Sequence, residues 1–294
     1  MSLALKGVFS ALITPFENGE VDYTSLEKLV DYQVSQGING LVINGTTAES
    51  PTLTLAEVTK IFSIVRAIVG LKFPLILGTG SNSTAKSVED TKKAAELGAD
   101  AALVVVPYYN KPPQRGIVQH YKAIAKNSEV PVILYNVPGR TITSMAADTI
   151  WELSEVKNIL GIKEASGDIA FDQKLKSKLP NDFVFLSGDD GTYIDFLKIG
   201  GHGIISVMSN IIPQLSVKWT QAFMNGSVNE TETIFKKFRA LINGMYVEAN
   251  PIPVKWMLYR KGLIKSPEMR LPLTELDSKF YAETEKLMME TGLL

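Results

Sequence analysis

Ile159-Leu-Gly-Ile-Lys163-Glu-Ala-Ser-Gly-Asp168 is a short apolar run that ends in one lysine and continues into a polar loop. Apolar runs of this length are typical of strands buried on both faces of a parallel sheet. A pattern with helical periodicity follows at residues 169–178. The stretch therefore predicts a strand, a loop and a helix, and the fold depends on how often this unit recurs.

The same unit recurs eight times along the chain. Strands are expected at residues 7–14, 40–44, 74–78, 101–106, 132–135, 159–163, 183–187 and 203–207. Helices are expected at residues 24–36 and 54–69, up to 97, from 114, from about 145, and at 169–178, 192–199 and 214–223. Eight such units in about 225 residues predict an α/β protein with a closed (β/α)8 TIM barrel. A doubly wound open sheet is the main alternative, but no Gly-x-Gly-x-x-Gly pattern follows the first strand.

After about residue 226 the strands stop, and only helical patterns remain, at residues 229–243, 252–261 and 275–292. We therefore expect two domains, a barrel catalytic domain at residues 1–225 and a small C-terminal helical domain at residues 226–294. Two helix starts carry a more specific signature. Thr24-x-x-Glu27 and Thr54-x-x-Glu57 both match a capping box, in which the threonine and the glutamate each bind a backbone N–H of the other.

Composition excludes several classes of function. The chain has 294 residues, of which 45% are hydrophobic, and its 30 basic and 31 acidic residues are interspersed, so nucleic acid is not an expected partner. There is no cysteine, which excludes disulfides, thiolate metal sites and cysteine nucleophiles. The start, Met1 to Lys6, lacks the apolar core of a signal peptide, and no run approaches the roughly 20 apolar residues of a membrane span. A soluble, cytoplasmic protein is expected.

Lys163 is the candidate nucleophile. At the end of a buried strand, desolvation disfavours the charged form of an amine, and a neutral amine can attack a carbonyl carbon. A lone lysine after a strand is more often just the first solvated residue. The polar residues that share its end of the barrel decide between these interpretations.

In TIM barrels the reactive groups stand at the carboxyl ends of the strands. The polar groups expected there, besides Lys163, are Tyr135, Gly45-Thr46-Thr47, Tyr108-Tyr109-Asn110 and Gly188-Asp189-Asp190.

Each of these groups has a chemical use and a plainer alternative. The Thr46-Thr47 loop could offer N–H groups and hydroxyls to a carboxylate, or it could be only a turn. Tyr135 could move protons for a neighbouring lysine, or it could cap the barrel core. Arg140 offers a guanidinium fork to a second carboxylate, or it could be a solvated cation of its loop.

A metal site is not expected. Asp189 and Asp190 could contribute carboxylates, but the only histidines are His120, on a predicted helix, and His202, just before a strand and so at the opposite end of the barrel. His202, between two glycines, is expected to be structural.

Six stretches resemble, in the same order along the chain, the signatures of the dihydrodipicolinate synthase and N-acetylneuraminate lyase family. The resemblance extends from about Gly7 to Leu294 and so covers nearly the whole chain. The stretches are Gly45-Thr-Thr-Ala-Glu-Ser50, Pro107-Tyr-Tyr-Asn-Lys-Pro112, Tyr135-Asn-Val-Pro-Gly-Arg-Thr141, Gly161-Ile-Lys-Glu-Ala-Ser-Gly-Asp168, Leu186-Ser-Gly-Asp-Asp190 and Asn250-Pro-Ile-Pro-Val-Lys255.

The resemblance implies a lyase of the class I aldolase type in diaminopimelate and lysine biosynthesis. Lys163 would form a Schiff base with pyruvate, the Thr46-Thr47 loop would hold its carboxylate, and the enamine would attack L-aspartate 4-semialdehyde. Neither a metal nor an organic cofactor is implied, because the lysine itself turns the ketone into an electron sink.

The resemblance also implies further roles. Tyr135, Thr47 and Tyr109 would form a proton relay, with Tyr109 reaching the active site of a neighbouring subunit in a homotetramer built from two dimers. Arg140 would receive the carboxylate of the aldehyde substrate. Gly188 and Ile205 would line the pyruvate pocket through their backbones.

Two other functions remain open. A related pyruvate-dependent aldolase would act on N-acetylneuraminate or a sugar-derived 2-oxo acid, whereas a catalytically silent barrel would only sense a small acid. Arg140 favours the semialdehyde, because a carboxylate needs a cation where a polyol needs neutral partners.

Two positions depart from the family pattern. Ala48 stands where most members have glycine, so the loop must avoid a positive φ there. The positions that match the lysine-binding contacts of regulated members are Leu55, Val58 and Lys86. Two apolar side chains and a like charge suit a cationic amino acid poorly, so weak or absent inhibition by lysine is expected.

Overall fold

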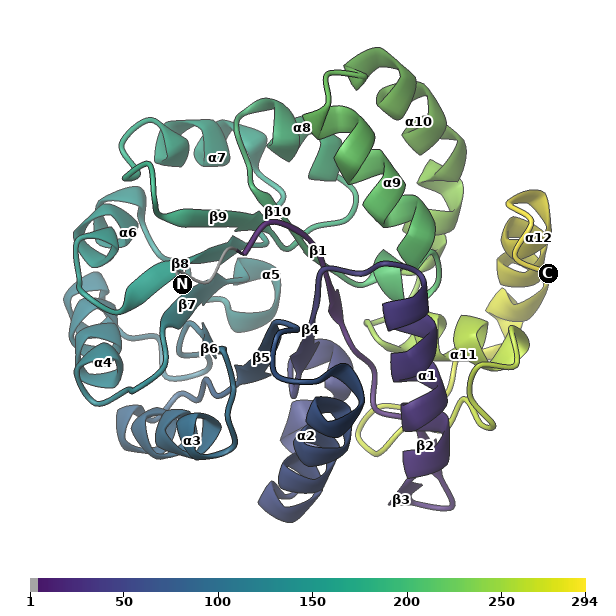
Figure 1. Cartoon of the computed structure of the whole chain (residues 1–294), viewed down its shortest axis with the longest axis horizontal. Coiled ribbons are helices and arrows are strands. Elements are labelled where there is room, and N and C mark those ends of the chain that lie inside the picture. The colour runs from purple at the N-terminus through teal and green to yellow at the C-terminus, as the bar shows by residue number, and fades with distance from the viewer. Residues whose placement is uncertain (1–4) are drawn as a thin grey trace. The chain divides into compact units, whose positions relative to one another are not determined.

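The computed structural model describes residues 5–294, so the first part of the Met1 to Lys6 start, on which the prediction of no signal peptide rests, lies outside the described residues. Eight parallel strands form a closed barrel in the order β1-β10-β9-β8-β7-β6-β5-β4 (Figure 1). The strands are β1 (Gly7–Ala11), β4 (Gly40–Ile43), β5 (Leu75–Gly78), β6 (Ala101–Val105), β7 (Val132–Asn136), β8 (Ile159–Glu164), β9 (Val184–Ser187) and β10 (Gly203–Ser206). The predicted TIM barrel is confirmed.

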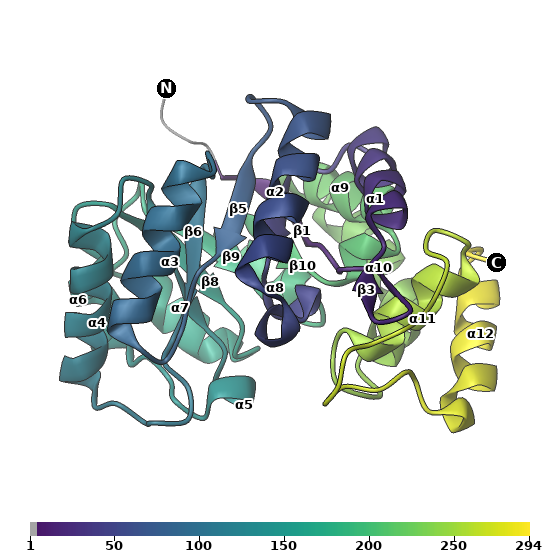
Figure 2. The same ribbon diagram turned by 90° about the horizontal axis from the view of Figure 1, so that it is seen from below.

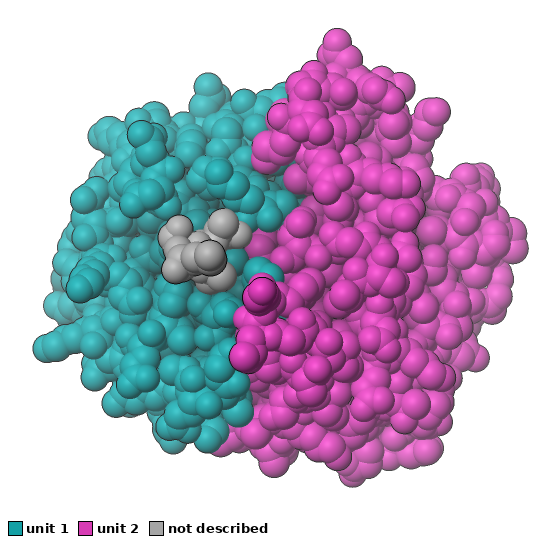
Figure 3. Space-filling model, viewed as in Figure 1, with its two compact units in different colours: residues 1–7, 74–205 teal, residues 8–73, 206–294 magenta. Residues whose placement is uncertain are grey.

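The chain divides into two compact units, coloured separately in Figure 3. Unit 1 comprises residues 1–7 and 74–205, and unit 2 comprises residues 8–73 and 206–294. This division cuts across the order of the elements along the chain. It runs through the barrel, whereas the predicted boundary between residues 225 and 226 follows the change of secondary structure and stays a prediction.

Unit 1 is a run of strands covered by helices on the outside, and neighbouring helices lie side by side (Figures 1 and 2). Its core joins the outward-facing side chains of β6 to β9 to the inner faces of the helices, and includes Val104, Tyr121, Ile150 and Phe185. The helices are α3 (Thr84–Glu96), α4 (Gln114–Lys126), α5 (Pro138–Thr141), α6 (Ala147–Ser154), α7 (Ile169–Lys176) and α8 (Tyr193–Lys198).

Unit 2 contains β1 from Val8 onward, paired in parallel with β4, and a short hairpin of β2 (Phe16–Glu17) and β3 (Glu20–Val21). No strand separates its last three helices, α10, α11 and α12, so the predicted C-terminal helical region is present. α12 packs beside α10 and α11 (Figure 2). The helical elements are α1 (Tyr23–Ser35), η1 (Thr46–Ala48), η2 (Ser50–Thr52), α2 (Leu55–Val69), η3 (Met208–Asn210), α9 (Pro213–Met224), α10 (Val228–Gly244), α11 (Ile252–Arg260), η4 (Ser278–Phe280) and α12 (Tyr281–Glu290).

One predicted capping box is confirmed and the other is wrong. At the start of α2 the Glu57 carboxylate accepts from Thr54 N at 2.8 Å, and Thr54 Oγ1 accepts from Glu57 N at 3.2 Å. α1 instead begins at Tyr23, and its N-cap is Asp22, whose carboxylate accepts from Ser25 N at 3.0 Å. A carboxylate caps a helix as well as a hydroxyl does, so Asp22 starts the helix before the predicted box.

Two other local features differ from the prediction. The last helix begins at Tyr281, because Asp277 caps a separate 3₁₀ turn by accepting from Lys279 N at 3.0 Å. The β2–β3 hairpin closes at Asn18-Gly19, with φ of 56° and 83°. Positive φ at both central residues suits the two-residue hairpin turn. The four-residue helix α5 was too short to leave a periodic signal.

No helix within residues 5–294 is long and apolar enough to cross a membrane.

Candidate active site

Lys163 and Tyr135 lie side by side at the carboxyl ends of two neighbouring strands. They are directly opposite each other in the parallel register of β8 and β7, so both side chains point to the same face of the sheet. Lys163 is only 6% exposed, and its Nζ lies 4.3 Å from the centre of the Tyr135 ring. The expected pairing of the lysine with a neighbouring tyrosine is present, and the alternative of a solvated lysine does not apply.

Gly188, directly after β9, makes room for the lysine. A Cβ at position 188 would lie 2.6 Å from Lys163 Cε and 3.0 Å from Lys163 Cγ. These distances are shorter than van der Waals contact, so a larger residue would displace the Lys163 stem. Ile205, on β10, is fully buried.

Arg140 and Tyr109 lie on more exposed loops of the same unit. Arg140 is in the short helix α5 after β7 and is exposed. Tyr109, after β6, is 88% exposed and has φ of 71°. Neither side chain belongs to the buried pair of Lys163 and Tyr135.

The Thr46-Thr47 loop of unit 2 follows β4 as the 3₁₀ turn η1. Thr47 is buried, and Asn250 Nδ2 donates to Thr47 Oγ1 at 3.0 Å. Ala48 is not among the described residues with positive φ, so the expectation that it avoids strain is confirmed. The left-handed conformation falls instead on Glu49, with φ of 58°.

Glu49 forms a fully buried ion pair with Lys255. Lys255 Nζ lies 2.6 Å from Glu49 Oε1 and also donates to the carbonyl of Glu268 at 2.6 Å. Arg270 N donates to the other carboxylate oxygen, Oε2, at 3.0 Å. Desolvation lowers the pKa of Lys255 to about 8, against the opposing charge of Glu49. The pair holds the end of the threonine loop.

Sequence reasoning missed this ion pair. Its two members are 206 positions apart, and periodicity carries no signal for such a contact. The available signal was that each residue lies within a stretch that resembles a family signature.

The outward face of β8 carries a second buried acid, Glu164. Its Oε2 accepts from Asn136 Nδ2 at 2.7 Å and its Oε1 accepts from Ser166 N at 2.7 Å. Burial raises the pKa of Glu164, and these hydrogen bonds oppose that effect. Nearby, Asp172 on α7 is also buried, and its pKa is raised to about 8 by burial and by the charges of Glu164, Asp168 and Asp189.

Replacing Asp172 by asparagine is expected to stabilise the protein most at high pH. The folded protein keeps a proton on Asp172 up to about pH 8, whereas the unfolded chain releases it near the ordinary pKa of 3.8. The folded state therefore binds more protons over this range, and the contribution of Asp172 to stability falls as pH rises from about 4 to about 8. Asp172→Asn should raise the free energy of unfolding by about 1–3 kcal/mol at pH 8 and by less at pH 5.

Urea unfolding at pH 5 and pH 8 measures this difference. Asp182→Asn is the matched control, because Asp182 is an exposed acid of the same unit. An equal effect of Asp172→Asn at the two pH values would contradict the assignment.

Two of the residues considered for a metal site, Asp189 and His202, have structural roles. The Asp189 carboxylate accepts from Thr192 N at 2.9 Å and from Thr192 Oγ1 at 2.7 Å, at the start of α8. His202 Nδ1 accepts from Phe185 N at 3.1 Å, which confirms its structural role. His120 is buried, and burial lowers its pKa to about 4. Within residues 5–294 no cluster of three histidine or acidic side chains could hold a metal ion.

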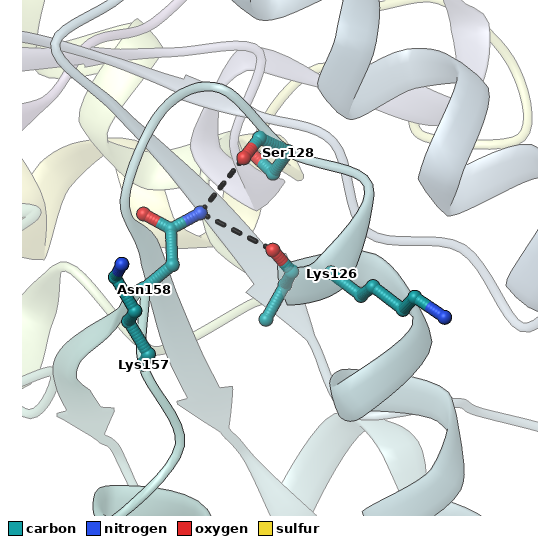
Figure 4. Close-up of a pocket in the computed structure, with 5 residues that line it drawn as sticks. Lys126, Ser128, Lys157 and Asn158 are labelled. Carbon is teal, nitrogen blue, oxygen red and sulfur yellow. Dashed lines mark hydrogen bonds between the residues drawn. The ribbon is translucent and has the colours of Figure 1, made fainter.

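A hollow of about 400 Å³ in unit 1 lies away from this chemistry (Figure 4). It is lined by Ala125, Lys126, Ser128, Lys157 and Asn158, which precede β7 and β8 and so stand at the amino ends of these strands. Asn158 Nδ2 donates to the carbonyl groups of Ala125 at 3.3 Å and Ser128 at 2.9 Å, so it ties this turn together. Since barrel active sites lie at the carboxyl ends, this hollow is not the candidate site.

Comparison with known proteins agrees with this geometry. The model of the dihydrodipicolinate synthetase family matches residues 4–291. The 4-hydroxy-tetrahydrodipicolinate synthase of Bdellovibrio bacteriovorus is 50% identical over 289 residues, which cover 98% of this chain and 99% of that protein.

Two solved structures are equally similar in fold. The chloride-inhibited dihydrodipicolinate synthase of Acinetobacter baumannii in complex with pyruvate has a TM-score of 0.96 and 42% identity, over 99% of this chain and 100% of that one. A monomeric dihydrodipicolinate synthase variant has a TM-score of 0.96 and 41% identity, over 98% and 97% of the two chains. With its eight-stranded barrel and its buried lysine, the chain belongs to the dihydrodipicolinate synthetase family.

Proposed function

We propose that this protein condenses pyruvate with L-aspartate 4-semialdehyde through a Schiff base on Lys163, the 4-hydroxy-tetrahydrodipicolinate synthase reaction. The observation that carries the proposal is the buried Lys163 amine, 4.3 Å from the Tyr135 ring at the carboxyl end of a barrel strand. Half of the residues are identical to those of a relative that bears this name, over nearly the full length of both chains.

The chemistry needs only groups of the chain. Lys163 Nζ adds to the C2 carbonyl of pyruvate and water leaves, which gives an imine. Loss of a methyl proton gives an enamine, whose carbon forms a bond to the aldehyde carbon of the semialdehyde. The amino group of that substrate then replaces Lys163 at C2, which closes the ring and frees the enzyme.

Tyr135, Thr47 and Tyr109 are proposed to move the protons of these steps, and the loop of Thr46 and Thr47 to bind the carboxylate of pyruvate. Because Asn250 Nδ2 donates to Thr47 Oγ1, the hydroxyl hydrogen of Thr47 is directed to a different acceptor. This direction supports a role for Thr47 as a donor. Gly188 and Ile205 are proposed to line the pyruvate pocket.

Arg140 is proposed to bind the carboxylate of the semialdehyde. Arg140→Ala is expected to raise the KM for L-aspartate 4-semialdehyde by roughly 10- to 100-fold, since a charge-assisted pair contributes about 1.5–3 kcal/mol. Formation of the pyruvate adduct should be retained, because Arg140 lies outside the buried Lys163 pair. Steady-state kinetics with each substrate varied in turn measure both effects.

Arg115→Ala is the matched control for this prediction, because Arg115 is an exposed cation in the first turn of α4. An unchanged semialdehyde KM in Arg140→Ala would remove Arg140 from the site. It would also weaken the preference for the semialdehyde over a sugar-derived substrate.

The experiment that tests the function combines borohydride trapping with product formation. Wild-type protein incubated with pyruvate and borohydride should gain one reduced pyruvyl adduct per chain, at Lys163. In a separate assay without borohydride, product should form with L-aspartate 4-semialdehyde and not with N-acetylneuraminate. Turnover of N-acetylneuraminate would favour the related aldolase, and no adduct at all would favour the sensing barrel.

A homotetramer built from two dimers, with Tyr109 shared across a subunit interface, is part of the same proposal. The 88% exposure of Tyr109 leaves it available to a second chain. A monomeric variant exists among similar structures, so assembly has to be measured, and sedimentation of the active enzyme would do so. A cytoplasmic location and weak inhibition by lysine also stay predictions.

A further inference from the structure

Directly after Tyr135 and Lys163, the two strands carry a second pair on their opposite faces. Asn136 and Glu164 are paired in the register of β7 and β8, one residue beyond Tyr135 and Lys163. Successive side chains of a strand point to opposite faces, so this pair points away from the lysine. Asn136 Nδ2 donates to Glu164 Oε2 at 2.7 Å, and both side chains are buried.

Every polar atom of the two side chains is bonded. Asn136 Oδ1 accepts from Met145 N at 3.0 Å, and Glu164 Oε1 accepts from Ser166 N at 2.7 Å. The backbone continues the contact, because Ala165 N donates to the Asn136 carbonyl at 2.9 Å. A buried pair with all its partners in place can take only one geometry.

The pairing of these strands is irregular just upstream. Val132 pairs with Ile159 and Ile133 pairs with Gly161, so one residue of β8 is skipped at that step. A slip of one residue turns every side chain of a strand to the opposite face. The hydrogen bond of Asn136 and Glu164 comes after the irregularity, where it holds the register in which Lys163 faces Tyr135.

An apolar pair could fill the same space without burying a carboxylate, which is costly in free energy. A hydrogen bond adds what apolar packing lacks, a dependence on direction and on the identity of the opposite residue.

We infer that Asn136 and Glu164 are positioning residues that fix the strand register and so hold the Lys163 amine beside Tyr135. The inference rests on the proposed function for its consequence in catalysis. A displacement of about 1 Å at a reacting group can cost about 100-fold in rate. Neither residue is proposed to touch a substrate.

An exchange of the amide and the carboxylate between the two positions, with each side-chain length kept, tests this inference. Asn136→Asp alone sets two carboxylates against each other. Glu164→Gln alone places the amide nitrogen of the glutamine against another donor, which is either Asn136 Nδ2 or Ser166 N, depending on how the amide is turned. In the double variant the new glutamine can donate to the new aspartate while each retains its backbone bond, and net charge is unchanged. The swap therefore restores all three side-chain hydrogen bonds, with the polarity of the bond between the two side chains reversed.

Each single variant is expected to lower kcat by roughly 10- to 100-fold with less than about a threefold change in the KM for pyruvate. The double variant should recover to within about threefold of wild type. Thr91→Val is the matched control, since it removes another buried hydrogen bond of unit 1, the one between the hydroxyl groups of Thr91 and Thr79 at 2.8 Å. It should lower stability while kcat stays unchanged.

A second readout does not depend on pyruvate. Reductive methylation of Lys163 by formaldehyde, read by peptide mass spectrometry against Lys157 in the same sample, reports how accessible the amine is. We expect the ratio of Lys163 to Lys157 methylation to rise at least about fivefold in each single variant and to fall back to the wild-type value in the double variant. If wild type formed no pyruvate adduct, the proposed function would be wrong. The ratio of Lys163 to Lys157 methylation would still test whether Asn136 and Glu164 position Lys163.

The inference is overturned by single variants with wild-type kcat and methylation ratio, or by a double variant that recovers neither. A loss of kcat in Thr91→Val as large as in the single variants would also overturn it, because the effect would then follow stability alone.

Discussion

Lys163→Ala is expected to abolish the reducible pyruvate adduct and to lower turnover by at least roughly 1,000-fold, because it removes the amine proposed to form the imine. The change removes a long side chain from a buried position beside Tyr135 and Gly188, so a small loss of stability is also expected. Lys163→Met keeps much of the stem volume without the amine and separates the two effects. Mass spectrometry of the trapped protein measures the adduct.

Lys255 is the strongest competing nucleophile in the described residues. The same trapping experiment tests whether Lys255 forms the pyruvate adduct. Its pKa is lowered to about 8, and by that criterion alone it resembles a catalytic lysine. Its Nζ, however, is held by Glu49 and by the carbonyl of Glu268. An adduct that persisted in Lys163→Ala and mapped to Lys255 would overturn the proposed mechanism.

Lys255→Met is expected to lower the free energy of unfolding by about 3–5 kcal/mol. The variant leaves the Glu49 carboxylate buried without its cation, and it also leaves the Glu268 carbonyl without this donor. Urea unfolding followed by circular dichroism measures the loss. The double variant with Glu49→Gln should regain part of it, because the uncompensated charge is then gone.

Lys122→Met provides a control of equal geometry. Lys122 Nζ also lies 2.6 Å from a carboxylate, that of Glu152, but the two side chains are 47% and 53% exposed. Exposed pairs contribute about 0–1 kcal/mol, so this variant should change stability little. Equal losses of unfolding free energy in Lys255→Met and Lys122→Met would show that burial does not make the loss of the Lys255 cation more destabilising.

The barrel and the position of Lys163 beside Tyr135 could be predicted because both depend on local signals. Apolar runs of strand length alternate with helical patterns, and a strand end followed by a polar loop marks the reactive edge of such a barrel. Lys163 and Tyr135 were placed together in this way, and the capping box at Thr54 was confirmed. The Thr24 box failed because Asp22, two residues earlier, offers an equally good acceptor.

The sequence alone determined the order of the strands along the chain, the residues at their ends and the family to which they belong. Only the tertiary structure decided which polar groups are buried together: Glu49 with Lys255, and Asn136 with Glu164 on the face opposite Lys163 and Tyr135. The physical reason is that a buried charge needs its partner in space, at any distance along the chain, whereas periodicity reports only on neighbours along the chain. We infer that the first contact holds the Thr46-Thr47 loop and the second holds Lys163. The sequence identified both as site candidates without showing what fixes their positions.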